Sequence, residues 1–187
     1  MKHASLSALL LLMAAAAAPA AAMAGDIVDA VIEIPAGSDV KYERDSAGRI
    51  FVDRFLPLPV AYPVNYGAIP GTRAGDGDEL DVLVLTRRPV APGAFIRVRV
   101  VGVLRMTDAG EGDDKIVAVP AAGVDAAYDH IRSIADLPEA ERARISAFFR
   151  LYKQAPDGRS PVVLSGFGDA AEAAAMLRAA TPRADEE

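Results

Sequence analysis

Alternation of apolar and polar residues is the dominant pattern in the first two thirds of the chain. Residues 96–100 alternate with a period of two, while residues 50–52, 82–85 and 116–119 form short apolar runs rich in β-branched side chains. Gly, Pro and Asp residues separate these runs and mark turns between them. Short strands at this spacing predict a β-barrel.

The period changes to that of a helix after Asp136. Pro138 is suited to the first turn of this helix, and four large apolar side chains recur on one face: Ile145, Phe148, Phe149 and Tyr152. A second, alanine-rich helix is predicted from Asp169, which with Glu172 resembles a capping box, to about Ala180. The predicted fold is therefore mainly β with flanking helices (α+β), a barrel with two C-terminal helices.

The first 24 residues differ from the rest in composition. A short basic start, an apolar run from Leu9 and the sequence Ala22-Met23-Ala24 are typical of a signal peptide cleaved after Ala24. An uncleaved membrane anchor is the alternative, although the run is rich in alanine and interrupted by Pro19. We therefore predict a periplasmic or secreted protein that leaves the membrane after cleavage, with a cytoplasmic location as the alternative.

Composition narrows the classes of function. Removing residues 1–24 from the 187 leaves 163, which suits one domain at residues 25–180 followed by a frayed acidic tail at 181–187. The formal charge of −6 disfavours binding to the phosphate backbone of nucleic acids. The chain has no cysteine, and His130 is its only histidine beyond the signal peptide. Disulfides and cysteine nucleophiles are thereby excluded, and a zinc site or a Ser-His triad has few candidate residues.

Two acidic turns are the main candidates for chemistry. The first, at the start of the 82–85 strand, contains Asp76, Asp78, Glu79 and Asp81. The second lies between strands that end near Met106 and start near Ile116, and contains Asp108, Glu111, Asp113 and Asp114. At an effective dielectric of about 20, two carboxylates about 5 Å apart repel by roughly 3 kcal/mol, so a cation is expected among them. Oxygen ligands without His or Cys favour Mg²⁺, Mn²⁺ or Ca²⁺.

The first acidic turn has two other interpretations. A turn rich in Asp and Gly is commonly a solvated loop. A calcium loop of the EF-hand type requires Asp or Asn at its fifth position, where Leu80 stands in this chain. The presence of a second acidic turn favours a metal cluster instead, because two turns at strand ends can converge on one point.

Basic and tyrosine side chains accompany the acidic turns. Strand alternation places Lys41 and Glu43 on one face, although such a pair is often a surface ion pair of small energy. Arg54 follows an apolar run, where a side chain directed to solvent is the alternative. Three further candidates follow the second turn or end the first helix: Lys115, Tyr152 and Lys153. Such donors around an acid-held metal cluster predict a site for a phosphate-rich anion.

Six segments of the chain resemble, in order and spacing, the soluble family I inorganic pyrophosphatases. They are VIEIPAGSDVKYE, FVDRF, YPVNYG, DGDELDVLVL, VGVLRMTDAGEGDDKIVAVP and FFRLYK. The resemblance covers roughly residues 27–175, and D-G-D-[P/E]-x-D-V is the signature of the family. Glu79 stands where many members have Pro, and Ala68 and Ala109 replace larger or acidic residues. Every matched catalytic position is retained.

The resemblance implies a five-stranded OB-like β-barrel that hydrolyses pyrophosphate to two phosphates, by a metal-bound hydroxide attacking phosphorus in line. It implies several Mg²⁺ ions, for which Mn²⁺ can substitute, and a general base at Asp78. It assigns metal ligands to Asp76, Asp81, Asp108, Asp113 and, through water, Glu33. It assigns phosphate contacts to Lys41, Arg54, Tyr66, Lys115, Tyr152 and Lys153, and further active-site positions to Glu43 and Tyr62. The family also implies a homo-oligomer, a hexamer in bacterial members.

Two other functions remain open from the sequence. An exported protein that binds metal and phosphate without turnover would share these ligands and differ at Asp78. An OB module for nucleic acid would need exposed aromatic and basic strand patterns, which are scarce in this chain. We therefore predict no nucleic-acid partner. An exported pyrophosphatase would recover phosphate or remove pyrophosphate outside the cytoplasm.

Overall fold

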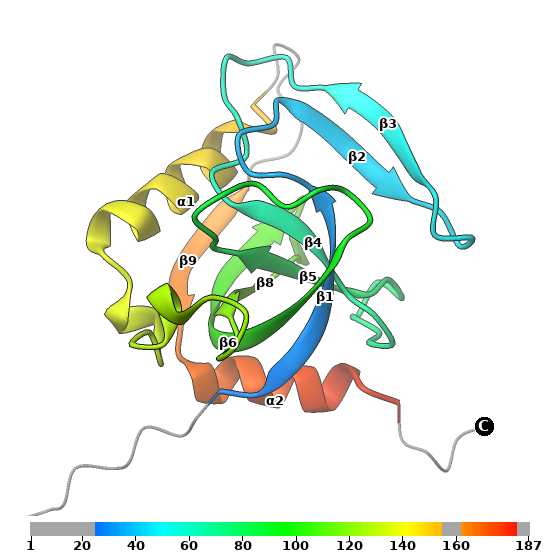
Figure 1. The fold of residues 1–187 in the computed structure, drawn as a ribbon. Helices are drawn as coiled ribbons and strands as arrows, with labels where there is room; N and C mark the ends of the chain where they lie inside the picture. The colour runs from blue at the N-terminus through cyan, green and yellow to red at the C-terminus, as the bar shows by residue number, and fades with distance from the viewer. Residues whose placement is uncertain (1–24, 155–161, 183–187) are drawn as a thin grey trace, which may run out of the picture.

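The computed structural model describes residues 25–154 and 162–182, and its centre is a closed barrel (Figure 1). The predicted signal peptide and residues 183–187 of the predicted acidic tail lie outside the described residues. Five strands pair in the order β1 (Ile27–Ile34), β4 (Asn65–Ile69), β5 (Leu80–Val84), β8 (Lys115–Pro120) and β6 (Phe95–Asp108). Strand β6 also pairs with β1, which closes the sheet. The predicted five-stranded OB-like barrel is confirmed.

Strands β5 and β8 form the one parallel pair of the barrel within the described part of the chain, with Val82 opposite Ile116. Both strands are buried on both faces. Val82 and Ile116 belong to a core cluster that contains residues of all five barrel strands and of α2, whereas Leu83 and Val117 belong to a second cluster that packs against α1. Burial on both faces explains why these two strands have continuous apolar sequences rather than alternating ones.

The first helix, α1 (Glu139–Leu151), packs along one side of the barrel (Figure 1). A 3₁₀ turn, η2 (Ile134–Asp136), precedes it, so the helix begins three residues later than the change of period after Asp136 indicated. Pro138 is the residue before the helix rather than part of its first turn. The four apolar residues that predicted this helix are all buried: Ile145, Phe148, Phe149 and Tyr152.

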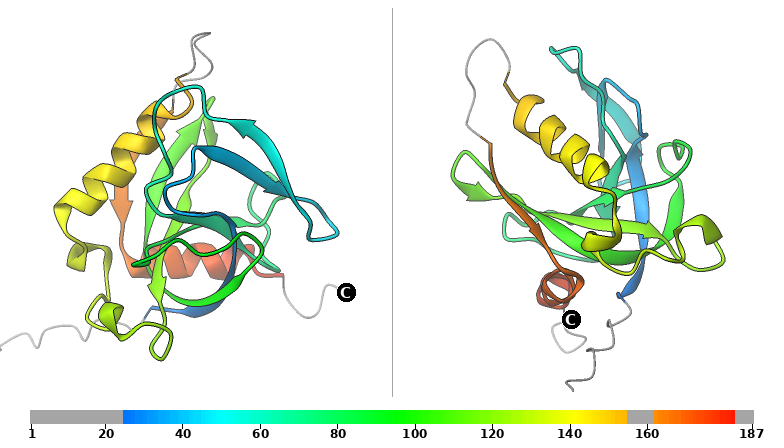
Figure 2. Two further views of the ribbon diagram at one scale, coloured as in Figure 1. Left: turned by 45° about the horizontal axis from the view of Figure 1, so that its top comes forward. Right: turned by 90° about the vertical axis from the view of Figure 1, so that its left-hand side faces the viewer.

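The second helix, α2 (Ala170–Ala180), crosses one end of the barrel, and the right-hand view of Figure 2 shows it nearly end-on. Asp169 caps it as predicted, because its carboxylate accepts a hydrogen bond from the Glu172 N–H at 2.9 Å. The Glu172 side chain does not complete a capping box. It pairs instead with Arg105 of β6 and so attaches the helix to the barrel.

Several elements were not predicted from the periodicity. Strand β9 (Val163–Gly168) and the short β7 (Glu111–Gly112) extend the sheet along β6. A 3₁₀ turn, η1 (Ala126–Tyr128), lies in the connection after β8. Strand β4 contains Gly67, where a Cβ atom would lie 1.9 Å from the carbonyl oxygen of Val31 on β1. The close approach of two strands therefore requires this glycine, although glycine in a sequence usually indicates a turn.

The hairpin of β2 (Val40–Arg44) and β3 (Ile50–Phe55) forms a separate two-stranded sheet. It stands beside the barrel rather than within it, as Figures 1 and 2 show. In the part of the chain that the structure describes, no helix is long and apolar enough to cross a membrane.

Candidate active site

A cavity of about 250 Å³ lies where the acidic turns, the β2–β3 hairpin and the end of α1 meet. Of the fourteen residues predicted for the site, twelve line this cavity: Lys41, Glu43, Arg54, Tyr62, Tyr66, Asp76, Asp78, Asp81, Asp113, Lys115, Tyr152 and Lys153. The remaining two, Asp108 and Glu33, are paired with Lys153 and with Arg44. The fold thus brings together residues that are up to 112 positions apart in the chain.

The first acidic turn is closed by backbone hydrogen bonds. The Ala74 N–H donates to the Asp78 carbonyl at 2.7 Å, and the Gly77 N–H donates to the Ala74 carbonyl at 3.0 Å. Gly77 has a φ of +95°, a conformation that residues with a Cβ rarely adopt. The Asp78 N–H also donates to Asp76 Oδ1 at 3.1 Å. This geometry holds the Asp76 and Asp78 carboxylates at the cavity wall.

Asp81, placed by the sequence in the turn before residues 82–85, lies one residue inside strand β5. Strand β5 begins at Leu80, so Asp81 is its second residue and pairs across the sheet with Ala68. Leu80 and Val82 on either side of it are buried in the core. Because side chains of a strand alternate between faces, Asp81 points to the cavity.

Lys115, the first residue of β8, is only 2 % exposed and forms ion pairs with Asp81 and Asp113. Its ammonium lies 5.9 Å from the ring centroid of Tyr66. Burial favours a lower pKa for Lys115, but the two carboxylates outweigh burial and the pKa is raised. Lys115 therefore remains positively charged.

Lys153, just after α1, forms the corresponding contact with the second acidic turn. Its ammonium pairs with Asp108 Oδ2 and lies 4.0 Å from Asp113 Oδ2. The other carboxylate oxygen of Asp108, Oδ1, is buried and has no hydrogen-bond partner. A buried carboxylate oxygen without a donor is costly, which makes this atom a candidate ligand.

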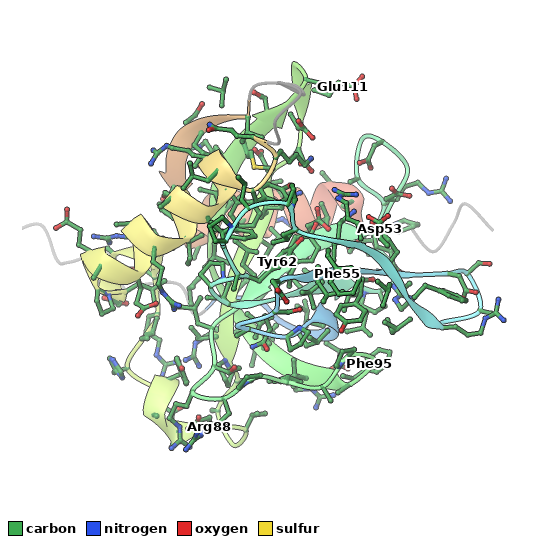
Figure 3. The ribbon with its side chains drawn as sticks, turned by 90° about the horizontal axis from the view of Figure 1, so that it is seen from above. Asp53, Phe55, Tyr62, Arg88, Phe95 and Glu111 are labelled. Atoms are coloured by element: carbon green, nitrogen blue, oxygen red, sulfur yellow. The ribbon has the colours of Figure 1, made fainter. Side chains whose placement is uncertain are left out.

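The other two acids of the second turn have different positions. Asp114 also lines the cavity, but its Oδ1 accepts a hydrogen bond from the Met106 N–H at 2.7 Å and so fixes the base of the turn. Glu111 is exposed, and Figure 3 shows it at an edge of the molecule. The acidic composition of the turn alone did not separate these roles.

The β2–β3 hairpin supplies a second wall. Lys41 pairs with Glu43, as strand alternation predicted, and lies 3.4 Å from Asp53. Arg54 lines the cavity and its Nη1 lies 2.6 Å from Asp53 Oδ2. Its side chain is still 48 % exposed, so it borders both the cavity and the solvent. Asp53 is labelled on the hairpin in Figure 3.

Three tyrosines form the apolar side of the cavity. The ring centroid of Tyr62 lies 5.8 Å from that of Tyr66 and 6.4 Å from that of Tyr152. Phe148 of α1 packs against Tyr62 and Tyr152 at 4.6 and 5.1 Å. Burial is the main cause that raises the pKa of each of the three hydroxyls. All three therefore remain neutral and able to donate a hydrogen bond.

Glu33 of β1 does not line the cavity and is connected to the first acidic turn through Arg44. Burial raises its pKa to about 7, and Arg44 acts in the opposite direction. Arg44 Nε lies 3.3 Å from Glu33 Oε1, and the same guanidinium pairs with Glu79. Glu79, which also lines the cavity, is directed at this arginine. The sequence pattern gave no signal for Arg44, which occupies an ordinary polar position at a strand end.

Comparison with known proteins agrees with this geometry. The sequence profile described as inorganic pyrophosphatase matches residues 30–185. The chain is 47 % identical to the inorganic pyrophosphatase of Vibrio cholerae over 161 residues, which is 85 % of this chain and 91 % of that protein.

The chain belongs to the inorganic pyrophosphatase family.

Solved structures of this family have the same fold. The crystal structure of inorganic pyrophosphatase from Thermus thermophilus superposes with a TM-score of 0.78 at 43 % identity, covering 87 % of this chain and 94 % of that one. The structure of the inorganic pyrophosphatase from Helicobacter pylori superposes with a TM-score of 0.80 at 36 % identity, covering 83 % of this chain and 91 % of that one. The resemblance inferred from the six segments is confirmed, and the chain is an enzyme of the inorganic diphosphatase class.

Membership of this family implies divalent metal ions. The side-chain donors at the cavity can therefore be compared with the ligands that such ions prefer. Among residues 25–154 and 162–182, no three acidic or imidazole side chains are grouped closely enough to hold a metal ion by themselves. Instead, Lys115 lies between Asp81 and Asp113. The donors are nevertheless carboxylate oxygens, and the buried Asp108 Oδ1 has no hydrogen-bond partner. This chemistry fits Mg²⁺ better than a soft metal.

Proposed function

We propose that the chain hydrolyses inorganic pyrophosphate to two phosphates in this cavity, with Mg²⁺ bound by its carboxylates. One observation carries the proposal: a single small cavity combines five aspartates with four cationic side chains. Aspartates without cations would suit a simple metal site, and cations without aspartates would suit an anion site. The combination suits an anion that arrives with divalent metal ions.

The metal ligands would be Asp76, Asp81, Asp108 and Asp113, with Glu33 acting through water. When bound, Mg²⁺ neutralises phosphate charge and lowers the pKa of a coordinated water. Asp78 would accept a proton from the attacking water at its carboxylate. Asp76 supports this role, because it accepts a hydrogen bond from the Asp78 N–H and so helps to hold the Asp78 carboxylate at the cavity wall.

The cationic residues would hold and stabilise the phosphates. Lys41 and Arg54 would bind pyrophosphate from the hairpin wall, and Lys115 and Lys153 from the barrel and α1. Charge that develops on the leaving phosphate would be stabilised by groups already in place, which is the main protein contribution in phosphoryl transfer. The tyrosines, including Tyr66, would donate hydrogen bonds from neutral hydroxyls.

The experiment that tests the role of Asp78 compares Asp78→Asn with Asp29→Asn. Asp29 is an exposed aspartate of β1, outside the cavity, and pairs with Arg97. We expect Asp78→Asn to lower kcat by about 10²–10⁴-fold, the usual effect of losing a positioned general base. Calorimetry should find Mg²⁺ binding largely retained, and Asp29→Asn should match the parent. An unchanged kcat in Asp78→Asn would remove Asp78 from this role.

The parent chain in the same experiment also tests the alternative of an exported binding protein without turnover. A chain that binds Mg²⁺ and pyrophosphate but releases no phosphate would support the binding-protein alternative.

We further propose that the protein is exported, on the basis of the N-terminal composition. Cell fractionation with N-terminal sequencing should find a periplasmic or secreted form that begins at Gly25. Full-length protein in the cytosol would contradict export without affecting the proposed chemistry.

We also propose a homo-oligomer, a hexamer by family resemblance. Exposed aromatic side chains support association, since Phe55 and Phe95 are 70 % and 68 % exposed and are labelled in Figure 3. Subunit interfaces are enriched in such residues. Light scattering coupled to size-exclusion chromatography should give a mass well above 19.6 kDa. A monomer at micromolar concentration would contradict this proposal.

A further inference from the structure

Arg44 connects three parts of the molecule. It is the last residue of β2, and its guanidinium contacts Glu33 of β1 at 3.3 Å and Glu79 of the first acidic turn. The arginine and both carboxylates are partly shielded from solvent. Arg44 itself does not line the cavity. Its contacts therefore serve the arrangement of the walls rather than direct binding.

Glu79 is held at both of its carboxylate oxygens. Oε2 pairs with Arg44, and Oε1 accepts a hydrogen bond from the Gly71 N–H at 3.1 Å. Gly71 precedes Asp76 and Asp78 in the chain, and Glu79 follows them. The turn that contains Asp76 and Asp78 is thus tied at both ends to one carboxylate, and that carboxylate is tied to Arg44.

Arg44 also connects the hairpin to the barrel. Within residues 25–154 and 162–182, the other ion pairs of the β2–β3 hairpin join residues of the hairpin to one another. Those of Arg44 reach the barrel strand β1 and the acidic turn. The hairpin supplies Lys41 and Arg54 to the cavity, whereas the turn supplies Asp76 and Asp78.

We propose that Arg44, acting through Glu79, is a positioning residue that fixes the hairpin wall relative to the acidic turn and so sets the affinity for Mg²⁺. This inference rests on the proposed function. A simple field effect would act in the opposite direction, because removing a positive charge near carboxylates should strengthen cation binding. For Arg44 the sign of the change therefore separates positioning from electrostatics. Glu79 itself lines the cavity, so the loss of its charge weakens Mg²⁺ binding by either route, and its variant tests only whether the two effects are coupled.

The test compares Arg44→Gln, Glu79→Gln and the double variant in the full chain. Gln at position 79 keeps an oxygen for the Gly71 N–H but loses the charge that pairs with Arg44. The matched control is Arg49→Gln, since Arg49 belongs to the same hairpin, pairs with Asp45 at 2.7 Å and is 71 % exposed. Three quantities are measured: the Mg²⁺ Kd by calorimetry, the exchange rate of backbone amides in residues 71–81, and kcat at saturating Mg²⁺.

We expect each single variant to weaken Mg²⁺ binding roughly 10-fold, the lower end of the effect of groups that orient metal ligands without touching the metal. Amides of residues 71–81 should exchange faster, while kcat at saturating Mg²⁺ should change by less than about threefold. The double variant should resemble either single variant, because coupled residues are not additive. Arg44→Lys, which keeps the charge but not the two-sided contact, should be intermediate and serves if Arg44→Gln does not fold.

Three results would overturn the positioning role: Arg44→Gln behaves like Arg49→Gln, it binds Mg²⁺ more tightly than the parent, or the two single effects add. The parent protein separates this inference from the proposed function. A parent that binds Mg²⁺ and releases phosphate, beside an Arg44→Gln variant with unchanged binding, would overturn the positioning alone. A parent with no Mg²⁺-dependent release would overturn the proposed function.

Discussion

The two walls of the cavity are built in different ways. On the barrel side, Lys115 is 2 % exposed and its charge is matched by Asp81 of the neighbouring strand β5 and by Asp113 of the second acidic turn. On the hairpin side, the side chains of Lys41 and Arg54 are 22 % and 48 % exposed, and both contact Asp53. The lysine of the barrel wall is part of the folded core, whereas the cations of the hairpin wall are partly solvated.

This difference between the walls predicts which substitutions change the stability of the fold and which change only the binding of substrate. Removing one member of a buried ion pair leaves an uncompensated charge and destabilises the fold. Removing one member of an exposed pair changes stability by less than about 1 kcal/mol. Substitutions in the barrel wall should therefore affect both folding and activity, and those in the hairpin wall should affect activity alone.

Lys115→Met should have the largest effect. Loss of the ammonium leaves the Asp81 and Asp113 carboxylates without their cation. We expect the free energy of unfolding to fall by about 2 kcal/mol. This is less than the roughly 3–5 kcal/mol of a fully buried pair, because both acids keep some contact with water. In the matched variant Lys41→Met, the free energy of unfolding should fall by less than about 0.5 kcal/mol. Chemical denaturation without metal measures both.

Two further measurements on Lys115→Met are its stabilisation by Mg²⁺ and its kcat. Mg²⁺ should stabilise this variant more than the parent, since a divalent cation can compensate the same carboxylates, and kcat should fall by about 10²–10³-fold. Equal stability losses for Lys115→Met and Lys41→Met would contradict the distinction between the walls.

Arg54→Gln should have the next largest effect, confined to activity. A charge-assisted hydrogen bond is worth about 1.5–3 kcal/mol, so kcat/KM should fall by about 10- to 150-fold. The Tm should stay within about 1 °C of the parent because the side chain is half exposed. Steady-state kinetics and a thermal melt on one preparation test this. A large fall in Tm would show that the hairpin arginine also supports the fold.

Tyr62→Phe should have the smallest effect. Its ring is buried against Phe148 and would be retained, so the free energy of unfolding should change little. The loss of one neutral hydroxyl should lower kcat/KM by about 2- to 13-fold. Because burial raises the pKa of this hydroxyl, the ratio of variant to parent should stay constant from pH 7 to 9. A ratio that changes with pH in this range would contradict a neutral donor.

The sequence predicted elements well where pattern and burial agree. Alternation in residues 96–100 and the helical spacing of Ile145, Phe148 and Phe149 correspond to β6 and α1. Strand β4 was not found because Asn65 and Gly67 are unusual in strands. Asn65 is fully buried, accepts hydrogen bonds from Ala36 and Val90, and donates to Val84 and Thr86. Such tertiary contacts override local propensity and leave no periodic signal.

The candidate site was predicted mainly through the family motifs. Motif positions identified Asp76, Asp78 and Asp81, and the fold places all three at one cavity. The connection from Arg44 to Glu79 spans 35 residues and depends on the placement of the hairpin beside the barrel. Neither residue carries a spacing that indicates the other, so this part of the site required the three-dimensional structure.

The most direct test of the account is the release of phosphate from pyrophosphate by the purified protein, measured with Mg²⁺, after chelation, and after Mg²⁺ is added back. We expect rapid release with Mg²⁺, background release with chelator, and full recovery on re-addition. Release that persists undiminished with chelator, or binding of Mg²⁺ and pyrophosphate without any release, would contradict the claim that this cavity is a metal-dependent pyrophosphatase site.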